Sequence, residues 1–154
     1  MEKKNKLIIR DDLPKGALRL LDSGSNEGYP ISYDSMKLLE VGYGYTKWEI
    51  EVNDNTKNPY GMIHGGVLFM ISDNCAGATA ATLGHKSVTL NSSINYIKSA
   101  KKGKVYATPK VVHNGKSTLV IEVTVVDEDG DVVSTSNFTM FSLGNIDTYK
   151  GDEK

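Results

Sequence analysis

The sequence predicts an α+β fold, in which one long buried α-helix lies against an antiparallel β-sheet. Residues 67–83 are almost continuously apolar, as expected of a helix that other structure surrounds. Segments with strand-like composition fill the second half of the chain and are separated at Gly103, Asn114-Gly115 and Asp129-Gly130. Because Asn-Gly and Asp-Gly favour the two-residue turns that join antiparallel strands, these segments are expected to form one antiparallel sheet.

Length and composition limit the function classes. The chain has 154 residues, 39% hydrophobic and 24% charged, which suits one compact domain. A formal net charge of -1 argues against a protein that mainly binds nucleic acid or an anionic membrane. No segment approaches the roughly 20 apolar residues of a membrane span, and a single cysteine, Cys75, excludes an internal disulfide. We therefore expect a cytoplasmic protein.

The first half of the chain divides into three parts. Residues 1–37 are interrupted by Pro and Gly and are expected to form an irregular lead-in, with a short helix near residues 16–21. Residues 38–52 are aromatic and β-branched, which predicts a hairpin with its turn at Gly42 to Gly44. The long helix follows and should stop at Gly84.

Four strands are predicted after the helix, over residues 86–97, 103–113, 116–127 and 131–143. In the first of them, one parity is apolar and expected to pack inward, and Thr89 lies on the opposite, polar face. The apolar residues of that strand are Val88, Leu90, Ile94 and Tyr96. In the third strand, alternation predicts that Leu119, Ile121, Val123 and Val125 face the helix. Residues 144–154 are expected to be a C-terminal tail, of which the last eight, "DTYKGDEK", are frayed.

Asp73 is the anomaly of the long helix, because its neighbours on the same stripe are apolar. An unpaired buried carboxylate costs several kcal/mol. Asp73 is therefore exposed, hydrogen-bonded from another element, or retained for chemistry. Just before the helix lie His64, Gly65 and Gly66, where the first N–H groups have no intrahelical partner and favour negative charge. On its own, a histidine here is more often a loop brace than a catalyst.

The run "NPYGMIHGGVLFMISDNCAGATAA" and the strands that follow it resemble the hotdog-fold acyl-CoA thioesterases of the phenylacetate-degradation (PaaI-like) type, within the 4-hydroxybenzoyl-CoA thioesterase superfamily. The resemblance runs from about Leu38 to Leu143, which assigns residues 38–143 to a hotdog domain. It implies a long helix wrapped by a curved antiparallel sheet. It also implies a homodimer joined edge to edge, and a dimer of dimers.

The same resemblance assigns roles by position. It makes Asp73 the general base or nucleophile and the backbone N–H of Gly65 the oxyanion donor. Asn58 matches a polar residue that orients water or the base, and Thr89 falls where relatives often carry Ser or Thr. His64 matches a histidine that holds the loop. The substrate would be an acyl-CoA thioester hydrolysed with no metal and no organic cofactor, coenzyme A being part of the substrate.

Geometry indicates that two subunits share the site. Gly65 and Asp73 are eight residues apart in the sequence, which corresponds to about 12 Å along a helix. One carbonyl group cannot lie roughly 3 Å from both within one chain. The sequence therefore predicts a composite site, with Asn58 and Gly65 of one subunit facing Asp73 and Thr89 of the other.

Residues that bind coenzyme A are harder to assign. Gly66 adjoins the oxyanion donor, and Lys98, Lys102, Lys116 and Ser117 are candidates for contacts to the substrate and its phosphates. The lysines fit solvated turns equally well. Two other functions also stay open, a hotdog hydratase or dehydratase acting on acyl-CoA or acyl carrier protein and a non-catalytic acyl-CoA-binding protein.

Overall fold

The computed structural model describes residues 7–22 and 35–150. In chain order the elements are β1 (Ile8–Ile9), α1 (Lys15–Asp22), β2 (Lys37–Gly42), β3 (Tyr45–Glu51), α2 (Gly65–Thr82), β4 (His85–Tyr96), β5 (Lys104–Asn114), β6 (Thr118–Asp127), β7 (Val132–Asn145) and the 3-10 turn η1 (Ile146–Thr148). The predicted hairpin is therefore present as β2 and β3, and the four predicted strands as β4 to β7.

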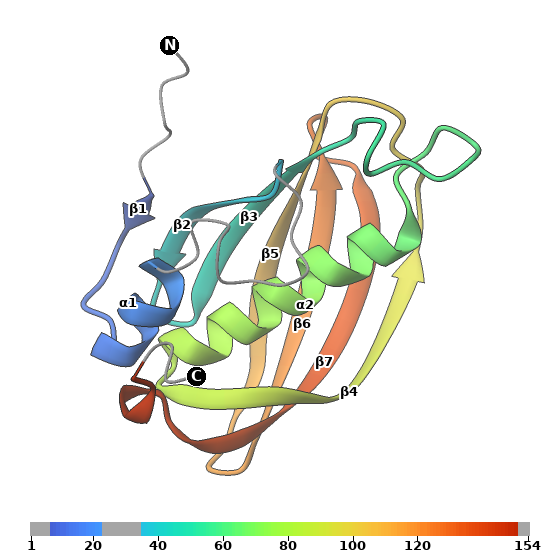
Figure 1. Ribbon diagram of the computed structural model, residues 1–154. Coiled ribbons are helices and arrows are strands. Elements are labelled where there is room, and N and C mark those ends of the chain that lie inside the picture. Colours follow the sequence, from blue (N-terminus) through green and yellow to red (C-terminus); the bar gives the residue numbers. More distant parts are fainter. Residues whose placement is uncertain (1–6, 23–34, 151–154) are drawn as a thin grey trace.

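All strands belong to one seven-stranded sheet in the order β1-β2-β3-β5-β6-β7-β4. Strand β1 is parallel to β2, and every other neighbouring pair is antiparallel. The sheet curves around α2, which lies along its concave face (Figure 1). This arrangement is the hotdog fold, and it confirms the predicted fold class.

Helix α2 is buried because it is apolar on nearly every side. Eleven of its residues are buried, and they come from all faces of the helix. Ile71, Cys75 and Ala80 are inaccessible to solvent, and Phe69 packs against Phe138 of β7 with ring centroids 5.7 Å apart. The helix ends where predicted, since Gly84 has a positive φ of 95° that continues neither helix nor strand.

The sheet contributes the other half of the core. Leu119, Ile121, Val123 and Val125 of β6 are all buried, as their alternation predicts. The predicted two-residue turns are wrong. The β5–β6 connection takes residues 115–117, because β5 runs through Asn114 and β6 starts only at Thr118. The β6–β7 connection takes residues 128–131, because β6 ends at Asp127 and β7 starts at Val132. Both are longer than a two-residue primed turn.

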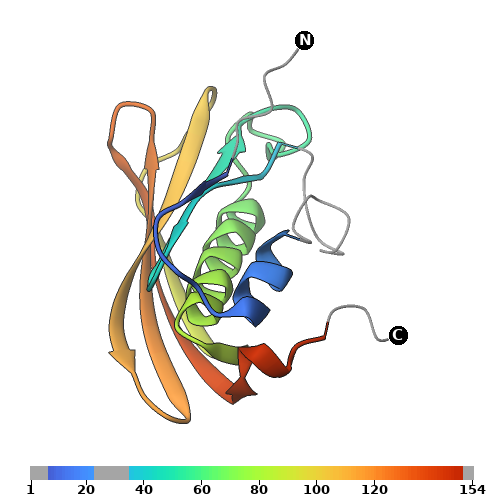
Figure 2. The ribbon, with the colours of Figure 1, turned by 90° about the vertical axis from the view of Figure 1, so that its left-hand side faces the viewer.

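Residues at both chain ends pack beside the C-terminal end of α2. The short helix predicted near residues 16–21 is α1, which lies against α2 and η1 (Figure 2). Strand β7 continues to Asn145, beyond the residue 143 at which the domain was predicted to end. The rest of the predicted lead-in, residues 1–6 and 23–34, and the last residues of the predicted tail, 151–154, lie outside the described residues.

Within the described part of the chain, no helix is long and apolar enough to cross a membrane.

Candidate active site

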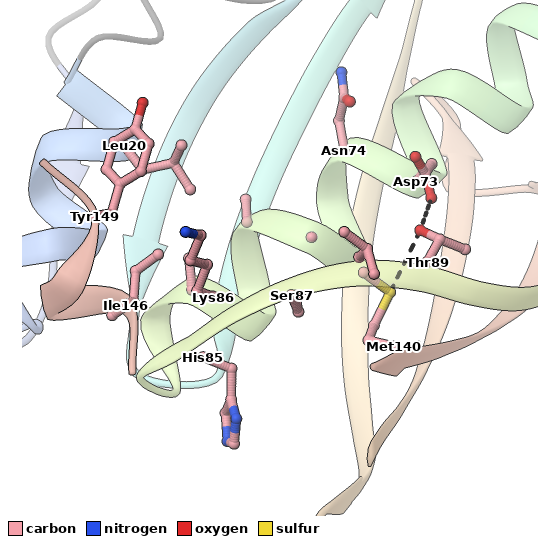
Figure 3. Close-up of a pocket in the computed structure, with 14 residues that line it drawn as sticks. Leu20, Asp73, Asn74, His85, Lys86, Ser87, Thr89, Met140, Ile146 and Tyr149 are labelled. Atoms are coloured by element: carbon pink, nitrogen blue, oxygen red, sulfur yellow. Dashed lines mark hydrogen bonds between the residues drawn. The ribbon is translucent and has the colours of Figure 1, made fainter. Parts of the chain in front are cut away.

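Asp73 is hydrogen-bonded from another element. It lies in the middle of α2 and is half-buried. The hydroxyl of Thr89, on β4, donates to Oδ1 of Asp73 at 2.6 Å, and the same hydroxyl lies 3.6 Å from the sulfur of Met140 (Figure 3). Within residues 7–22 and 35–150, only Thr89 donates to Asp73. This leaves the second carboxylate oxygen available to a bound molecule.

A β-bulge explains why Thr89 faces the helix. Thr89 pairs with Met140 of β7, whereas Asn91 pairs with the preceding residue, Thr139, so Leu90 is an extra residue in β4. A bulge shifts the side chains beyond it by one position and so changes which of them face the core. As a result the Thr89 side chain points toward α2 before the bulge, although Thr89 stays exposed to solvent, and Ile94 packs on the core after it.

The prediction for β4 is therefore partly wrong. Val88, Leu90 and Tyr96 were expected in the core, but 47%, 62% and 56% of their surface is exposed. Thr89 was assigned to the outer polar face, but it contacts the helix. Simple alternation fails here because it assumes one residue per pairing position along the whole strand.

Asn58 organises the loop that leads into α2. Its side-chain oxygen accepts hydrogen bonds from the backbone N–H groups of Tyr60 at 3.0 Å and Met62 at 3.1 Å. Its own N–H also donates to the carbonyl of Met62 at 2.7 Å. Asn58 therefore shapes the turn, and its side-chain NH2 group has no partner among the residues that the structure describes.

His64 caps α2. Its Nδ1 accepts a hydrogen bond of 2.8 Å from the N–H of Gly66, and its extended backbone places it as the N-cap. The carbonyl of His64 accepts from Val67 and Leu68, at 3.0 and 3.2 Å. These contacts agree with a loop-holding role for His64, as the resemblance implies. They also occupy the N–H of Gly66, which was a candidate for substrate contact.

Gly65 is the first residue of α2, and Tyr96 holds its carbonyl group. The Tyr96 hydroxyl donates to that carbonyl at 3.1 Å, and a Cβ on Gly65 would lie only 3.1 Å from the Tyr96 ring. The N–H of Gly65 has no acceptor among residues 7–22 and 35–150. The Gly65 carbonyl and the Gly66 N–H, by contrast, are both hydrogen-bonded. An N–H group so fixed at a helix N-terminus suits a developing negative charge.

One chain does not bring the two halves of the predicted site together. Asp73 and Thr89 line a cleft of about 510 Å³ between α2 and β4. Asn58, Gly65 and Tyr96 line a separate hollow of about 320 Å³ at the N-terminal end of α2. Both halves adjoin β4, which is an edge strand of the sheet.

The predicted coenzyme A contacts are also separated. Lys98 and Lys102 lie in the connection from β4 to β5, whereas Lys116 and Ser117 lie in the β5–β6 turn at the opposite end of these strands. Lys102, Lys116 and Ser117 are exposed.

Lys98 already has two anionic partners. Its ammonium group contacts the carboxylates of Asp127 at 2.8 Å and Asp131 at 2.5 Å. The hydrogen bond that Lys98 donates to Asp127, followed by the one that it donates to Asp131, raises the pKa of Lys98 above its usual value. Lys98 is therefore less suited to a phosphate than its sequence position indicates.

Cys75 is unsuited to nucleophilic chemistry. Its side chain is buried, and burial raises the pKa of the thiol to about 12, although hydrogen bonds with Thr46 and Thr79 oppose that rise. The reactive form of a cysteine is its thiolate. Cys75 is therefore a core residue.

Sequence reasoning missed two parts of the site. The first is Tyr96 as the residue that fixes Gly65, since it was assigned only to the core. The second is the end of the cleft, which Leu20 of α1, Ile146 of η1 and Tyr149 line. No local motif marks either, because both contacts join residues far apart in the sequence.

The geometry defines a class of protein, a hotdog fold with a helix-borne carboxylate in an open cleft. Residues 60–134 match the family model described as the Thioesterase superfamily. A 1,4-dihydroxy-2-naphthoyl-CoA hydrolase of Listeria monocytogenes is 30% identical over 112 residues, which cover 68% of this chain and 88% of that protein. The chain belongs to the thioesterase superfamily and is a thioester hydrolase.

Solved structures of similar proteins agree with this family assignment. A Streptococcus pneumoniae protein, described as a hypothetical thioesterase and solved with coenzyme A, is 32% identical with a TM-score of 0.71, covering 73% of this chain and 89% of that one. That protein was also solved with an aspartate or a threonine replaced by alanine, two residues with the 16-residue spacing of Asp73 and Thr89. The PaaI protein of Escherichia coli, 19% identical, shares the fold with a TM-score of 0.78 over 87% of this chain and 98% of its own.

Proposed function

We propose that this protein hydrolyses acyl-CoA thioesters to a free acid and coenzyme A. The observation that carries the proposal is the hydrogen bond of 2.6 Å from Thr89 to Asp73 in an open cleft. The bond fixes one carboxylate oxygen and leaves the other for reaction. The coenzyme A and naphthoyl-CoA in the names of the relatives support a coenzyme A thioester as the substrate.

The reaction needs a base or nucleophile and a donor for the oxyanion. In the water-mediated course, water attacks the thioester carbonyl and gives its proton to Asp73, while the Gly65 N–H stabilises the tetrahedral oxyanion. Collapse breaks the carbon–sulfur bond, and Asp73 returns the proton to the sulfur of coenzyme A. In the alternative course Asp73 attacks directly, and water then hydrolyses the resulting anhydride.

We place the two halves of the site on two subunits. Gly65 and Asp73 line separate hollows within one chain, and a distance of about 12 Å along α2 separates them. Strand β4 has a free edge over 12 residues, and a long unpaired edge is a site for pairing with another chain. Edge-to-edge pairing of β4 in a homodimer would put each Asp73 close to a Gly65 of the second subunit.

A dimer of dimers is a further part of the proposal. Strands β4, β5 and β7 carry large apolar side chains that stay exposed, among them Val88, Val112, Phe141 and Leu143, at 41–55%. Exposed apolar clusters of this kind commonly mark association surfaces. The number of subunits is measurable by light scattering.

The function is tested with purified protein and a panel of short, medium, long and aromatic acyl-CoAs, with release of the coenzyme A thiol as the signal. Asp73→Asn keeps the side-chain shape but removes the base, so turnover should fall roughly 100-fold or more. Asp54→Asn is the matched control, because the Asp54 side chain is fully exposed and lines neither hollow. Unchanged turnover in Asp73→Asn, or binding without turnover in the wild type, would contradict the proposal.

We also propose that hydrolysis needs no metal ion. In the described part of the chain, no group of three or more His, Cys, Asp or Glu side chains is placed to hold one. Dialysis against a chelator should leave the rate unchanged. Activity that is lost on dialysis and restored by a divalent metal would refute this part of the proposal.

A further inference from the structure

The cleft that begins at Asp73 continues along α2 to its C-terminal end. Its walls are one face of α2 and the start of β4, and its far end is formed by Leu20, Ile146 and Tyr149 (Figure 3). Asp73 and Thr89 lie at one end of this cleft and the three apolar side chains at the other. A molecule that reacts at Asp73 therefore has a continuous space in one direction along the helix.

Small residues of α2 create this space. Gly77, Ala78 and Ala81 line the cleft, and a Cβ added to Gly77 would meet no atom within 4 Å. The groove is thus open at Gly77, one helical turn beyond Asp73. A side chain at this position would therefore start into the groove without its Cβ displacing the protein's own atoms.

The two segments that form the far end of the cleft, α1 and η1, are held firmly together. The N–H of Gly16 donates to Asp147 at 2.7 Å, and a Cβ on Gly16 would lie 2.0 Å from the carbonyl oxygen of Ile146. Ala17, Ala81 and Ile146 form a small buried cluster, on which Leu20 and Tyr149 pack. Helix α1 and η1 are thus joined to each other and to the end of α2.

The lining favours an acyl group over the phosphates of coenzyme A. The ionisable side chains of the cleft, apart from Tyr149, are Asp73 at one end and His85 and Lys86 on β4. Both ring nitrogens of His85 are bonded, to Ser142 and to Asn114. Several phosphate charges would need more cations than Lys86 supplies, whereas an apolar chain loses its contact with water here and gains stability.

The length of the groove limits the length of the acyl group that it can hold. Asp73 and Ala81 are eight residues apart on α2, which is about 12 Å along the axis. Extended covalent chains advance about 1.2 Å per bond, since an extended residue has three bonds and spans roughly 3.3–3.6 Å. The groove therefore accepts about ten bonds before it meets the side chains at its far end.

We propose that this cleft holds the acyl group and that Leu20 and Tyr149 close it, so that the enzyme prefers straight medium-length acyl chains of about ten carbons. The proposal rests on the proposed function. Helix α1 and η1 lie outside residues 60–134, the part that matches the family model. The limit on acyl length would therefore come from segments of this protein that lie outside the part matched by the family model.

The test compares kcat/KM for acetyl-, decanoyl- and palmitoyl-CoA in two variants. Gly77→Leu fills the groove, and leucine is a better helix former than glycine, so the helix should remain stable. It should lower the ratio of decanoyl to acetyl cleavage at least about 10-fold, the scale on which apolar pockets discriminate methylene groups. Leu20→Ala opens the far end and should raise the ratio of palmitoyl to decanoyl cleavage by a similar factor.

Leu18→Ala is the matched control, because Leu18 lies on the same helix, is half-buried, and lines a different hollow. Its chain-length profile should equal that of the wild type. A wild type that cleaves acyl-CoAs, together with unchanged ratios in Gly77→Leu, would overturn this inference alone. A wild type that cleaves none of the three would overturn the proposed function and this inference with it.

Discussion

The Thr89 hydroxyl donates a hydrogen bond of 2.6 Å to Asp73 across the gap between β4 and α2. A threonine hydroxyl has one proton, so that bond fixes its direction. The bond restricts the rotation of the carboxylate and holds one oxygen toward the sheet. In the proposed reaction, the other oxygen then needs no ordering when the substrate binds.

We predict that Thr89→Val lowers kcat about 10-fold to 100-fold, since a hydrogen bond to a charged group contributes about 1.5–3 kcal/mol. Thr89→Ser keeps the hydroxyl and should restore most of the activity. Steady-state hydrolysis of a good acyl-CoA substrate measures both variants. If serine and valine at this position were equally impaired, packing against Met140 would explain the effect better than the hydrogen bond to Asp73.

A second prediction concerns Gly65. Gly65→Pro removes the N–H, and the position tolerates proline because it is the first of the helix. His64, which precedes it, already has the extended ψ of 136° that a residue before proline adopts. Loss of an oxyanion donor should cut kcat by about 100-fold to 1,000-fold.

Gly65→Ala is the control for this substitution. It introduces the same Cβ, 3.1 Å from the Tyr96 ring, but keeps the N–H. The alanine variant should therefore be much more active than the proline variant, with both compared by kcat and by thermal unfolding. Equal activity in the two variants would remove the Gly65 N–H from the mechanism.

Tyr96 is predicted to act as a positioning residue through Gly65. Tyr96→Phe keeps the ring but deletes the hydroxyl that holds the Gly65 carbonyl at 3.1 Å. A single neutral hydrogen bond contributes about 0.5–1.5 kcal/mol, so kcat should fall about twofold to tenfold with KM nearly unchanged. A change confined to KM would indicate that Tyr96 contacts the substrate instead.

The sequence predicts the scaffold better than the site because periodicity reports burial. Continuous apolarity correctly predicts the burial of α2, and alternation correctly predicts the inner face of β6. The same rule fails in β4, where the extra residue Leu90 changes the face on which Thr89 lies. Composition does not reveal a bulge, since the residues on each side of it keep ordinary strand propensities.

The other contacts of the site that the sequence did not predict join residues far apart in the chain. Gly16 and Asp147, which join the two ends of the chain, are 131 residues apart. Tyr96 and Gly65 are 31 residues apart and meet only because β4 returns along α2. The hydrogen bond to Asp73 from another element was among the outcomes that the sequence predicts, because an unpaired carboxylate on a buried apolar helix is costly.

Cys75 is predicted to be unreactive in the native protein. Burial raises the pKa of its thiol to about 12, so almost none is present as thiolate at pH 8. An aromatic disulfide reagent should detect no protein thiol under native conditions and one thiol per chain after unfolding. Rapid native reaction would show that the α2 core opens readily, and would require Cys75→Ser in any assay that detects released coenzyme A by its thiol.

The last prediction tests the shared site. If Asp73 of one subunit and Gly65 of the other act on the same carbonyl, Asp73→Ala and Gly65→Pro homodimers should each be inactive. Refolding the two variants together randomises the subunits, and a mixed dimer then has one site with both defects and one site with neither. Because half of the dimers are mixed and each regains one of two sites, activity should recover to about a quarter of the wild-type value.

Catalysis within a single chain predicts a different result, since every chain in the mixture carries one defect. Differently tagged chains, captured together after refolding, measure the exchange independently of activity. Confirmed exchange with no recovery would refute the shared site. Groups about 12 Å apart on α2 would then have to serve one bond. That requires the start of α2 to move toward Asp73, which the hydrogen bond from Tyr96 to Gly65 and the one from Gly66 to His64 oppose.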